Sequence, residues 1–288
     1  MQTLRECLKE AEKKGIAIGH FNVSNSEMIN AVWSGAKKTG SPVIIGLSEG
    51  ERDFMGTGQA AAFVRSIRKE FNYPIFLNAD HTYSFERVKE AVDAGFDAVI
   101  FDGASLSFAE NVKITRECAD YAKKINPEII IEGELGFIGK SSKILDDLPE
   151  GVDLSPEGLT SPEEAVRFVE EGAVDIFAPA VGNMHGMLVG GRDPKLNIER
   201  IKEISEAVGK PLVLHGGSGN SAEEIKEAIK AGIRIVHINT EIRLAYRKAL
   251  QISLSENPEE IAPYKYMKGP VLAVEKLVEE KLQIFSSH

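Results

Sequence analysis

The sequence is short of cysteine, of long apolar runs and of positive charge, and each shortage excludes a class of protein. Only two of the 288 residues are cysteines, Cys7 and Cys118, and they stand in no metal-binding or redox spacing. No apolar run approaches the roughly 18 residues of a membrane span. The net charge of -10 disfavours nucleic acid and anionic membranes as partners. We therefore expect a reduced, cytoplasmic protein.

Signals of targeting and of domain boundaries are also missing. The first ten residues have the charge pattern of an amphipathic helix and not that of a signal peptide. No low-complexity segment or interdomain linker interrupts the chain. A length of 288 residues suits one large α/β domain or two small ones. We predict a single domain over residues 1–288.

What the chain has instead is an alternation of two patterns along its length. Short apolar, β-branched runs, typical of buried parallel strands, alternate with stretches of helical periodicity. The runs predicted as strands are residues 16–22, 42–48, 75–81, 98–102, 129–134, 175–181, 211–215 and 233–239. Eight strand–helix units favour a (β/α)8 TIM barrel, whereas a doubly wound sheet would need fewer units or a second domain. An N-terminal helix at 4–14 is placed to close the bottom of the barrel, and an extra C-terminal helix is predicted at 269–283.

Polar residues gather at the carboxyl ends of the predicted strands, where TIM barrels carry their active sites. Turn residues such as Gly15 and Gly209 stand at the opposite ends. The strand-end residues are Asn22, Ser48, Asp80, His81, Asp102, Glu134, His185, His215 and Asn239. This one-sided enrichment predicts a functional site at that mouth of the barrel.

Three of these strand ends carry a histidine beside glycine or aspartate, namely His81, His185 and His215. One such histidine alone is more often a hydrogen-bonded structural residue. Three at the ends of parallel strands in one barrel can converge, and three imidazoles with an open fourth position form a catalytic zinc-type site. Asp102 and Glu134 offer oxygen ligands for a second metal or for an alternative position of the first. The alternative for these two carboxylates is a solvated strand end.

Two further carboxylates lie beside the predicted ligands. Asp80 precedes His81 and so points to the other side of the strand end unless the strand breaks. A carboxylate beside a metal site is a candidate general acid or base, and the alternative for Asp80 is a turn residue. Glu132 shares a face with Glu134, two residues deeper, and is predicted to support a ligand or to form a buried ion pair.

Two glycine- and hydroxyl-rich loops offer backbone N–H groups to an anion. Gly216, Gly217 and Ser218 precede one predicted helix, and Asn239 and Thr240 begin another. These loops follow the seventh and eighth strands, the usual phosphate-binding place in a TIM barrel.

The motifs at these positions resemble those of the class II, metal-dependent fructose-bisphosphate and tagatose-bisphosphate aldolases. The resemblance covers most of the chain. It is carried by Ala79-Asp80-His81, Phe101-Asp102-Gly103, Glu132-Gly133-Glu134-Leu135-Gly136, Gly182-Asn183-Met184-His185-Gly186, His215-Gly216-Gly217-Ser218-Gly219 and Asn239-Thr240-Glu241.

The resemblance implies a role for each site residue. His81, His185 and His215 bind a catalytic zinc, Asp102 and Glu134 belong to a second or alternative metal position, and Asp80 is the acid or base for the C4 hydroxyl. The residues implied to bind substrate are Asn22, Ser48, Gly186, Gly216, Gly217, Ser218, His237, Asn239 and Thr240. A sodium or potassium ion near the carbonyls of Met184, Gly186 and Gly216 is also implied.

The implied activity is reversible, zinc-dependent cleavage of a ketose 1,6-bisphosphate to dihydroxyacetone phosphate and glyceraldehyde 3-phosphate. The implied protein is a cytoplasmic homo-oligomer, a dimer or tetramer, whose partner is a phosphorylated sugar. A Schiff-base aldolase would need a lysine on a barrel strand, and no predicted strand carries one near its carboxyl end. Two alternatives stay open: a metal-dependent sugar-phosphate isomerase or epimerase, and a non-catalytic sugar-phosphate-binding protein.

The sequence departs from the family's pattern at two places. His237 stands where the family usually has asparagine; it donates a hydrogen bond to substrate, turns to the metal, or is a structural core residue. The loop after Gly136 lacks the glutamate that moves the C3 proton in the family, with no carboxylate before Asp146. If the protein is an active aldolase, we predict that Asp146, Asp147 or Glu150 takes over this task; the alternative is a solvated acidic loop.

Overall fold

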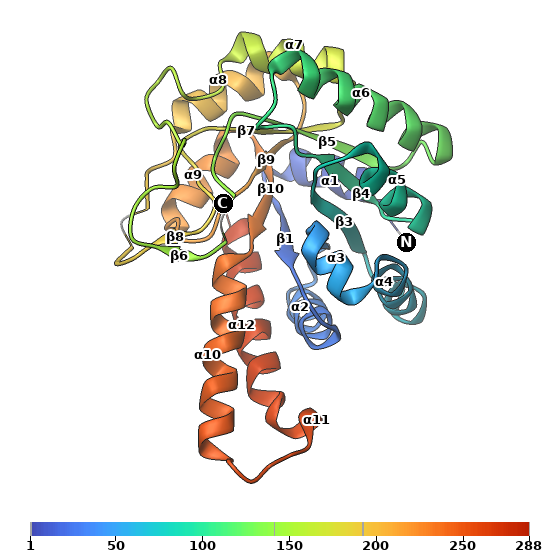
Figure 1. The fold of residues 1–288 in the computed structure, drawn as a ribbon, viewed down its shortest axis with the longest axis vertical. Coiled ribbons are helices and arrows are strands. Elements are labelled where there is room, and N and C mark those ends of the chain that lie inside the picture. The colour runs from blue at the N-terminus through green and yellow to red at the C-terminus, as the bar shows by residue number, and fades with distance from the viewer. Residues whose placement is uncertain (1, 141, 192, 288) are drawn as a thin grey trace.

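A closed barrel of eight parallel strands forms the centre of the computed structural model, which describes residues 2–140, 142–191 and 193–287 (Figure 1). In order around the barrel, the strands are β1 (Ile18–Asn22), β2 (Val43–Leu47), β3 (Ile75–Thr82), β4 (Ala98–Phe101), β5 (Ile130–Leu135), β7 (Ile176–Pro179), β9 (Leu212–Leu214) and β10 (Ile233–Ile238). Every pairing around the barrel is parallel, so all eight carboxyl ends open on one mouth. The predicted TIM barrel is confirmed.

Helices connect the strands and cover the outside of the barrel. They are α1 (Leu4–Lys14), α2 (Ser26–Thr39), α3 (Glu49–Met55), α4 (Thr57–Phe71), α5 (Phe85–Ala94), α6 (Phe108–Ile125), α7 (Pro162–Gly172), α8 (Ile198–Val208), α9 (Ala222–Ala231), α10 (Thr240–Glu256), α11 (Pro263–Tyr266) and α12 (Lys268–Phe285). Several begin at a capping box. Ser107, Ser161 and Ser221 each accept from the N–H of a glutamate three residues on, whose carboxylate bonds back. These capping boxes satisfy backbone N–H groups in the first turn and so fix where the three helices begin.

Helix α1 closes the bottom of the barrel, as predicted. Its Leu4 and Leu8 are buried in one cluster with the inward-facing Phe76, Ile130 and Val213 of the strands. Burying a leucine side chain contributes about 2 kcal/mol, so this plug stabilises the end of the barrel opposite the mouth.

Four short elements were not predicted: α3, α11, β6 (Ile144–Leu145) and β8 (Met187–Leu188). Strands β6 and β8 pair with each other outside the barrel and tie the loop after β5 to the loop after β7. Helix α3 starts directly after Ser48, which caps it in a capping box with Glu51. These elements are too short to show a period of their own, which is why the sequence does not reveal them.

Helices α10 and α12 lie side by side and extend beyond the barrel, with α11 at the far end (Figure 1). Helix α12 also packs against α2 at the barrel wall. Within the part of the chain that the structure describes, no helix combines the length and apolar character needed to cross a membrane.

Candidate active site

The end of β3 is bulged, and this bulge sets the geometry of the site. Between Ala79 and Thr82 the strand advances by three residues while its partner β4 advances by two. His81 has φ 43°, in the left-handed region that few residues other than glycine adopt. Adjacent residues of a regular strand point to opposite sides, but because the strand is broken here, Asp80 and His81 lie on the same side. Both carboxylate and imidazole therefore line the mouth of the barrel.

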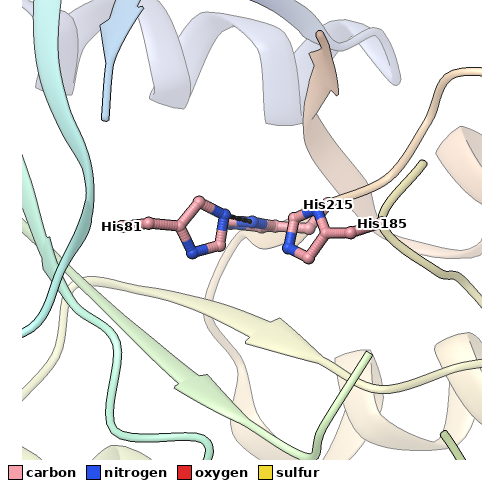
Figure 2. A group of neighbouring side chains, drawn as sticks. All are labelled: His81, His185 and His215. Carbon is pink, nitrogen blue, oxygen red and sulfur yellow. Dashed lines mark hydrogen bonds between the residues drawn. The ribbon is translucent and has the colours of Figure 1, made fainter. Parts of the chain in front are cut away.

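The three predicted histidines converge at this mouth (Figure 2). His81 comes from β3, His185 from the loop after β7 and His215 from the end of β9. One ring nitrogen from each lies within 4.8 Å of the others. His81 Nε2 and His215 Nδ1 are 3.1 Å apart, and His185 Nε2 is buried without a hydrogen-bond partner.

Carboxylates behind two of the histidines fix which nitrogen faces the centre. Asp102 Oδ2 lies 2.8 Å from His81 Nδ1, and Glu132 Oε1 lies 2.6 Å from His215 Nε2. A carboxylate acceptor on one ring nitrogen orients the ring and leaves the other nitrogen as the ligand atom. Glu132 therefore supports a predicted ligand.

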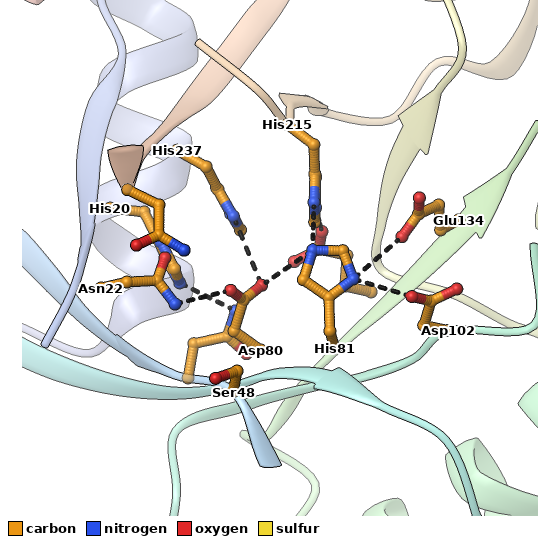
Figure 3. Close-up of polar contacts among 12 residues, drawn as sticks. His20, Asn22, Ser48, Asp80, His81, Asp102, Glu134, His215 and His237 are labelled. Carbon is orange, nitrogen blue, oxygen red and sulfur yellow. Dashed lines mark hydrogen bonds and ion pairs between the residues drawn. The ribbon is translucent and has the colours of Figure 1, made fainter. Parts of the chain in front are cut away.

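Asp102 and Glu134 lie on the far side of His81 from His215 (Figure 3). Glu134 Oε2 is 3.6 Å from His81 Nδ1, and the three residues form a second group whose ligand atoms lie within 4.8 Å. Burial, and then the charge of Asp102, raise the pKa of Glu134 to about 7. Burial alone would lower the pKa of His81, but Asp80 and Asp102 hold it well above its usual value.

Asp80 is buried and held from two sides (Figure 3). Asn22 Nδ2 donates to its Oδ2 at 2.8 Å, while Oδ1 lies 3.5 Å from His237 Nδ1 and 3.8 Å from His81 Nε2. Burial alone would raise the pKa of Asp80, but His81 and His237 keep it well below its usual value. The side chain is therefore a carboxylate in the resting protein, the form that accepts a proton.

His237 lies beside this carboxylate, between the imidazole rings of His20 and His215. Its ring stacks on His20, with centroids 3.5 Å apart and planes within 4°, and lies 4.1 Å from the ring of His215. His20, Asp80 and His237 also offer ligand atoms within 4.8 Å of one another. The lone pairs of two stacked, parallel imidazoles lie in separate parallel planes, however, so these two rings suit a shared metal ion less well than the three tilted rings of His81, His185 and His215. The structure puts His237 in contact with Asp80 and on the wall of a pocket.

Two adjoining pockets open at the mouth. The larger, of about 640 Å³, is lined by Ser48, Asp80, His81, Asp102, His185 and Asn239 together with loop residues. The narrower, of about 20 Å³, is lined among others by Asn22, Gly186, Gly216, Ser218, His237, Asn239 and Thr240. Nearly all the predicted substrate-binding residues are thus brought together.

Gly217 is the exception among these residues, and Gly216 is fixed by its backbone. The N–H of Gly217 donates to the carbonyl of His237 at 3.1 Å, so it is not available to an anion. Gly216 has φ 62°, and a Cβ there would lie 2.0 Å from the carbonyl oxygen of Met184. Only glycine fits that position.

The loop after β5 folds over the site. Lys140, Lys143 and Glu150 line the larger pocket, whereas Asp146 and Asp147 do not. Ser142 Oγ accepts from Asn239 Nδ2 at 3.1 Å, which ties the loop to the narrower pocket. Of the three carboxylates proposed as a base, Glu150 is the one that the structure places at the site.

Three site residues escaped the sequence interpretation: Glu51 and Arg52 of α3, and Arg243 of α10. Glu51 accepts from Asn22 Nδ2 at 3.1 Å and forms an ion pair with Arg243, which lines the larger pocket. The available signal was the charged run that follows Ser48, but a charged run is usually a solvated surface. Glu51 and Arg52 are in fact buried.

The comparisons with known proteins agree with this geometry. The family described as "Fructose-bisphosphate aldolase class-II" matches residues 2–288. The chain belongs to that family. A fructose-bisphosphate aldolase of Staphylococcus epidermidis is 33% identical, with 99% of this chain and 97% of the relative covered. One of Geobacillus stearothermophilus is 34% identical, with 99% and 96% covered.

Solved structures of aldolases share the fold. The YdjI aldolase from Escherichia coli K12 has a TM-score of 0.82 and 30% identity, with 98% of this chain and 96% of that chain covered. A putative fructose-1,6-biphosphate aldolase from Coccidioides immitis has a TM-score of 0.83 and 30% identity, with 98% and 95% covered. The enzyme is therefore a lyase of the class II, metal-dependent aldolase family, and its predicted family and enzyme class are confirmed.

Proposed function

We propose that the enzyme reversibly cleaves a ketose 1,6-bisphosphate between C3 and C4, giving dihydroxyacetone phosphate and glyceraldehyde 3-phosphate. The observation that carries the proposal is the meeting of His81, His185 and His215 beside the carboxyl group of Asp80, whose Oδ1 lies 3.8 Å from His81 Nε2. The relatives named fructose-bisphosphate aldolase support the same substrate class.

The donor set fits a divalent metal, for which we propose zinc. His185 Nε2 is buried without a partner, and two further nitrogens, of His81 and His215, face it from rings oriented by carboxylates. Leaving a buried polar atom unpaired costs about 1–3 kcal/mol, which a metal–ligand bond would offset. Three imidazoles are the ligand set of catalytic zinc, while Asp102 and Glu134 suit a second or alternative position. When bound, zinc would supply Lewis-acid stabilisation of the negative charge that develops at the substrate carbonyl.

Asp80 is the group that moves the C4 hydroxyl proton. As the C3–C4 bond breaks, that hydroxyl becomes the aldehyde and its proton needs an acceptor. Asn22 donates to one oxygen of Asp80, while the other, Oδ1, faces the site and lies 3.5 Å from His237 Nδ1. In the condensation direction the same carboxyl returns the proton.

The two ends of the substrate meet different walls of the site. Gly186, Gly216, Ser218, Asn239 and Thr240 line the narrower pocket and suit the phosphate of dihydroxyacetone phosphate. The larger pocket is lined by three cationic side chains, Lys140, Lys143 and Arg243, which suit the phosphate of the aldehyde half. Holding both ends aligns the reacting carbons with Asp80.

Replacing Glu150 should slow the removal of the C3 proton from dihydroxyacetone phosphate. Glu150→Gln keeps the size of the side chain but removes the base, so deuterium exchange at C3 should fall about 10²-fold or more, with zinc binding unchanged. The matched control is Asp147→Asn in the same loop, which does not line the pocket and should exchange at the parent rate. Parent-rate exchange in Glu150→Gln would place the base elsewhere, with His237 as the next candidate.

The proposed function is tested by product analysis. Zinc-loaded protein is incubated separately with fructose 1,6-bisphosphate and tagatose 1,6-bisphosphate, and triose phosphates are trapped enzymatically. Release of triose phosphates from one of them supports the proposal and shows which C4 configuration is preferred. Interconversion of sugar phosphates without triose release would show an isomerase or epimerase, and binding without turnover a non-catalytic protein.

A further inference from the structure

Arg52 is a buried cation beneath the bulge that carries Asp80 and His81. It is 1% exposed although it belongs to α3, a short helix at the rim of the barrel. Its Nη1 donates to the carbonyl of Leu47 at 2.7 Å and lies 3.5 Å from the carbonyl of Asp80, while Nη2 donates to Thr82 Oγ1 at 3.1 Å. The guanidinium therefore bridges the end of β2 and both sides of the bulge in β3.

These contacts replace the hydrogen bonds that the bulge takes away. The regular pairing of β2 with β3 ends at Leu47 and Ala79. Beyond this pair, strand-to-strand pairing no longer supplies hydrogen bonds to the backbone carbonyls. An unpaired buried carbonyl costs about as much as a lost hydrogen bond. Thr82 Oγ1 is fixed in turn by donating to the Ala79 carbonyl at 3.3 Å. Arg52 and Thr82 together brace the backbone on either side of residues 80 and 81.

Burying the Arg52 guanidinium costs free energy, which argues for a role beyond filling the core. Its hydrogen-bond acceptors are two backbone carbonyls and a hydroxyl, all uncharged. The charges of Glu49, Asp80 and Glu90 act on it without a direct ion pair among the described residues, and burying a cation in such a setting is costly. Burial lowers the pKa of Arg52. The left-handed backbone at His81 is also strained, and such strain persists only where the surroundings impose it.

We propose that Arg52 is a positioning residue that holds the β3 bulge, so that Asp80 and His81 face the same centre. The planar fork of arginine matters because two acceptors on different segments are bridged at once, which the single nitrogen of lysine does not do. Without the brace, residues 79–82 relax toward a regular strand, and Asp80 and His81 turn to opposite faces.

The test compares Arg52→Met, Arg52→Lys and Thr82→Val with the matched control Arg68→Met. Arg68, of α4, braces the other end of the same strand, donating to the Ile75 carbonyl at 2.7 Å from Nη2 and pairing with Asp97. Zinc affinity is measured by competition with a chelator, and backbone amide exchange is followed at residues 79–82. The amide-exchange readout does not depend on the proposed function, whereas zinc affinity rests on the proposed metal site and turnover on the proposed aldolase activity.

In Arg52→Met, zinc affinity should fall about 10–100-fold, the effect of disturbing the support of a metal ligand. Amide exchange at 79–82 should accelerate, and kcat should fall about 10²-fold with a smaller change in KM. Arg68→Met should lose stability but keep the parent zinc affinity. Should Arg52→Met fail to fold, Arg52→Lys and Thr82→Val decide, since both keep the core filled and both should weaken zinc binding. Parent zinc affinity and parent exchange at 79–82 in the folded variants would overturn the proposal.

Discussion

Asp80→Ala should lose cleavage activity by at least about 10²-fold while keeping its zinc, because a positioned acid or base contributes on this scale. Asp80 lies beside the histidine cluster without belonging to it, and its oxygens face Asn22, His81 and His237. Removing it takes away the acceptor for the C4 proton but none of the three ligand nitrogens. The measurements are kcat for cleavage and zinc content after dialysis.

Asp80→Asn serves as the matched variant because it keeps the shape and one hydrogen-bonding oxygen. It should be almost as inactive as Asp80→Ala, since an amide does not accept the proton. If either variant turned over at near the parent rate, Asp80 would not be the acid or base. If both lost zinc, the loss of activity would have a different cause.

Replacing any one of His81, His185 and His215 with alanine should remove the metal and with it the cleavage activity. His185→Ala is the cleanest case, because His185 Nε2 has no other partner in the resting site. Metal content should fall from about one ion per chain to near zero after dialysis, since two imidazoles are too few for a stable zinc site.

His237→Asn is the control for the metal variants, because it installs the residue that the family usually carries. His237 lies outside the three-histidine cluster and contacts Asp80, so the variant should retain its zinc. Full metal content in all three alanine variants would refute the proposed ligand set. Loss of zinc in His237→Asn would instead make that histidine a fourth ligand.

The barrel and much of the site were predictable because they follow from local patterns. Apolar β-branched runs specify buried parallel strands, and histidines at three strand ends converge once the strands are parallel. The capping boxes that begin helices at Ser107 and Ser161 are local in the same way. These signals involve residues within a few positions of one another.

What escaped depends on contacts between distant segments. The bulge at Asp80 and His81 is not visible in a strand pattern, since it is held by side chains from elsewhere. Glu51 and Arg52 lie in a charged run that is typical of a surface. These two side chains are nevertheless buried, because Asn22 and Arg243 contact Glu51, and the Asp80 carbonyl and the Thr82 hydroxyl accept from Arg52. Of the acidic residues in the loop after β5, only the folded chain distinguishes Glu150 by placing it at the pocket.

The most direct measurement is the release of triose phosphate from fructose 1,6-bisphosphate by chelator-stripped protein as zinc is added back. The stripped protein should be inactive, and activity should rise with zinc until about one ion per chain is bound, since a single three-histidine site carries the chemistry. Cleavage at the full rate without metal would contradict the account, because some group other than zinc would then have to stabilise the negative charge at the substrate carbonyl.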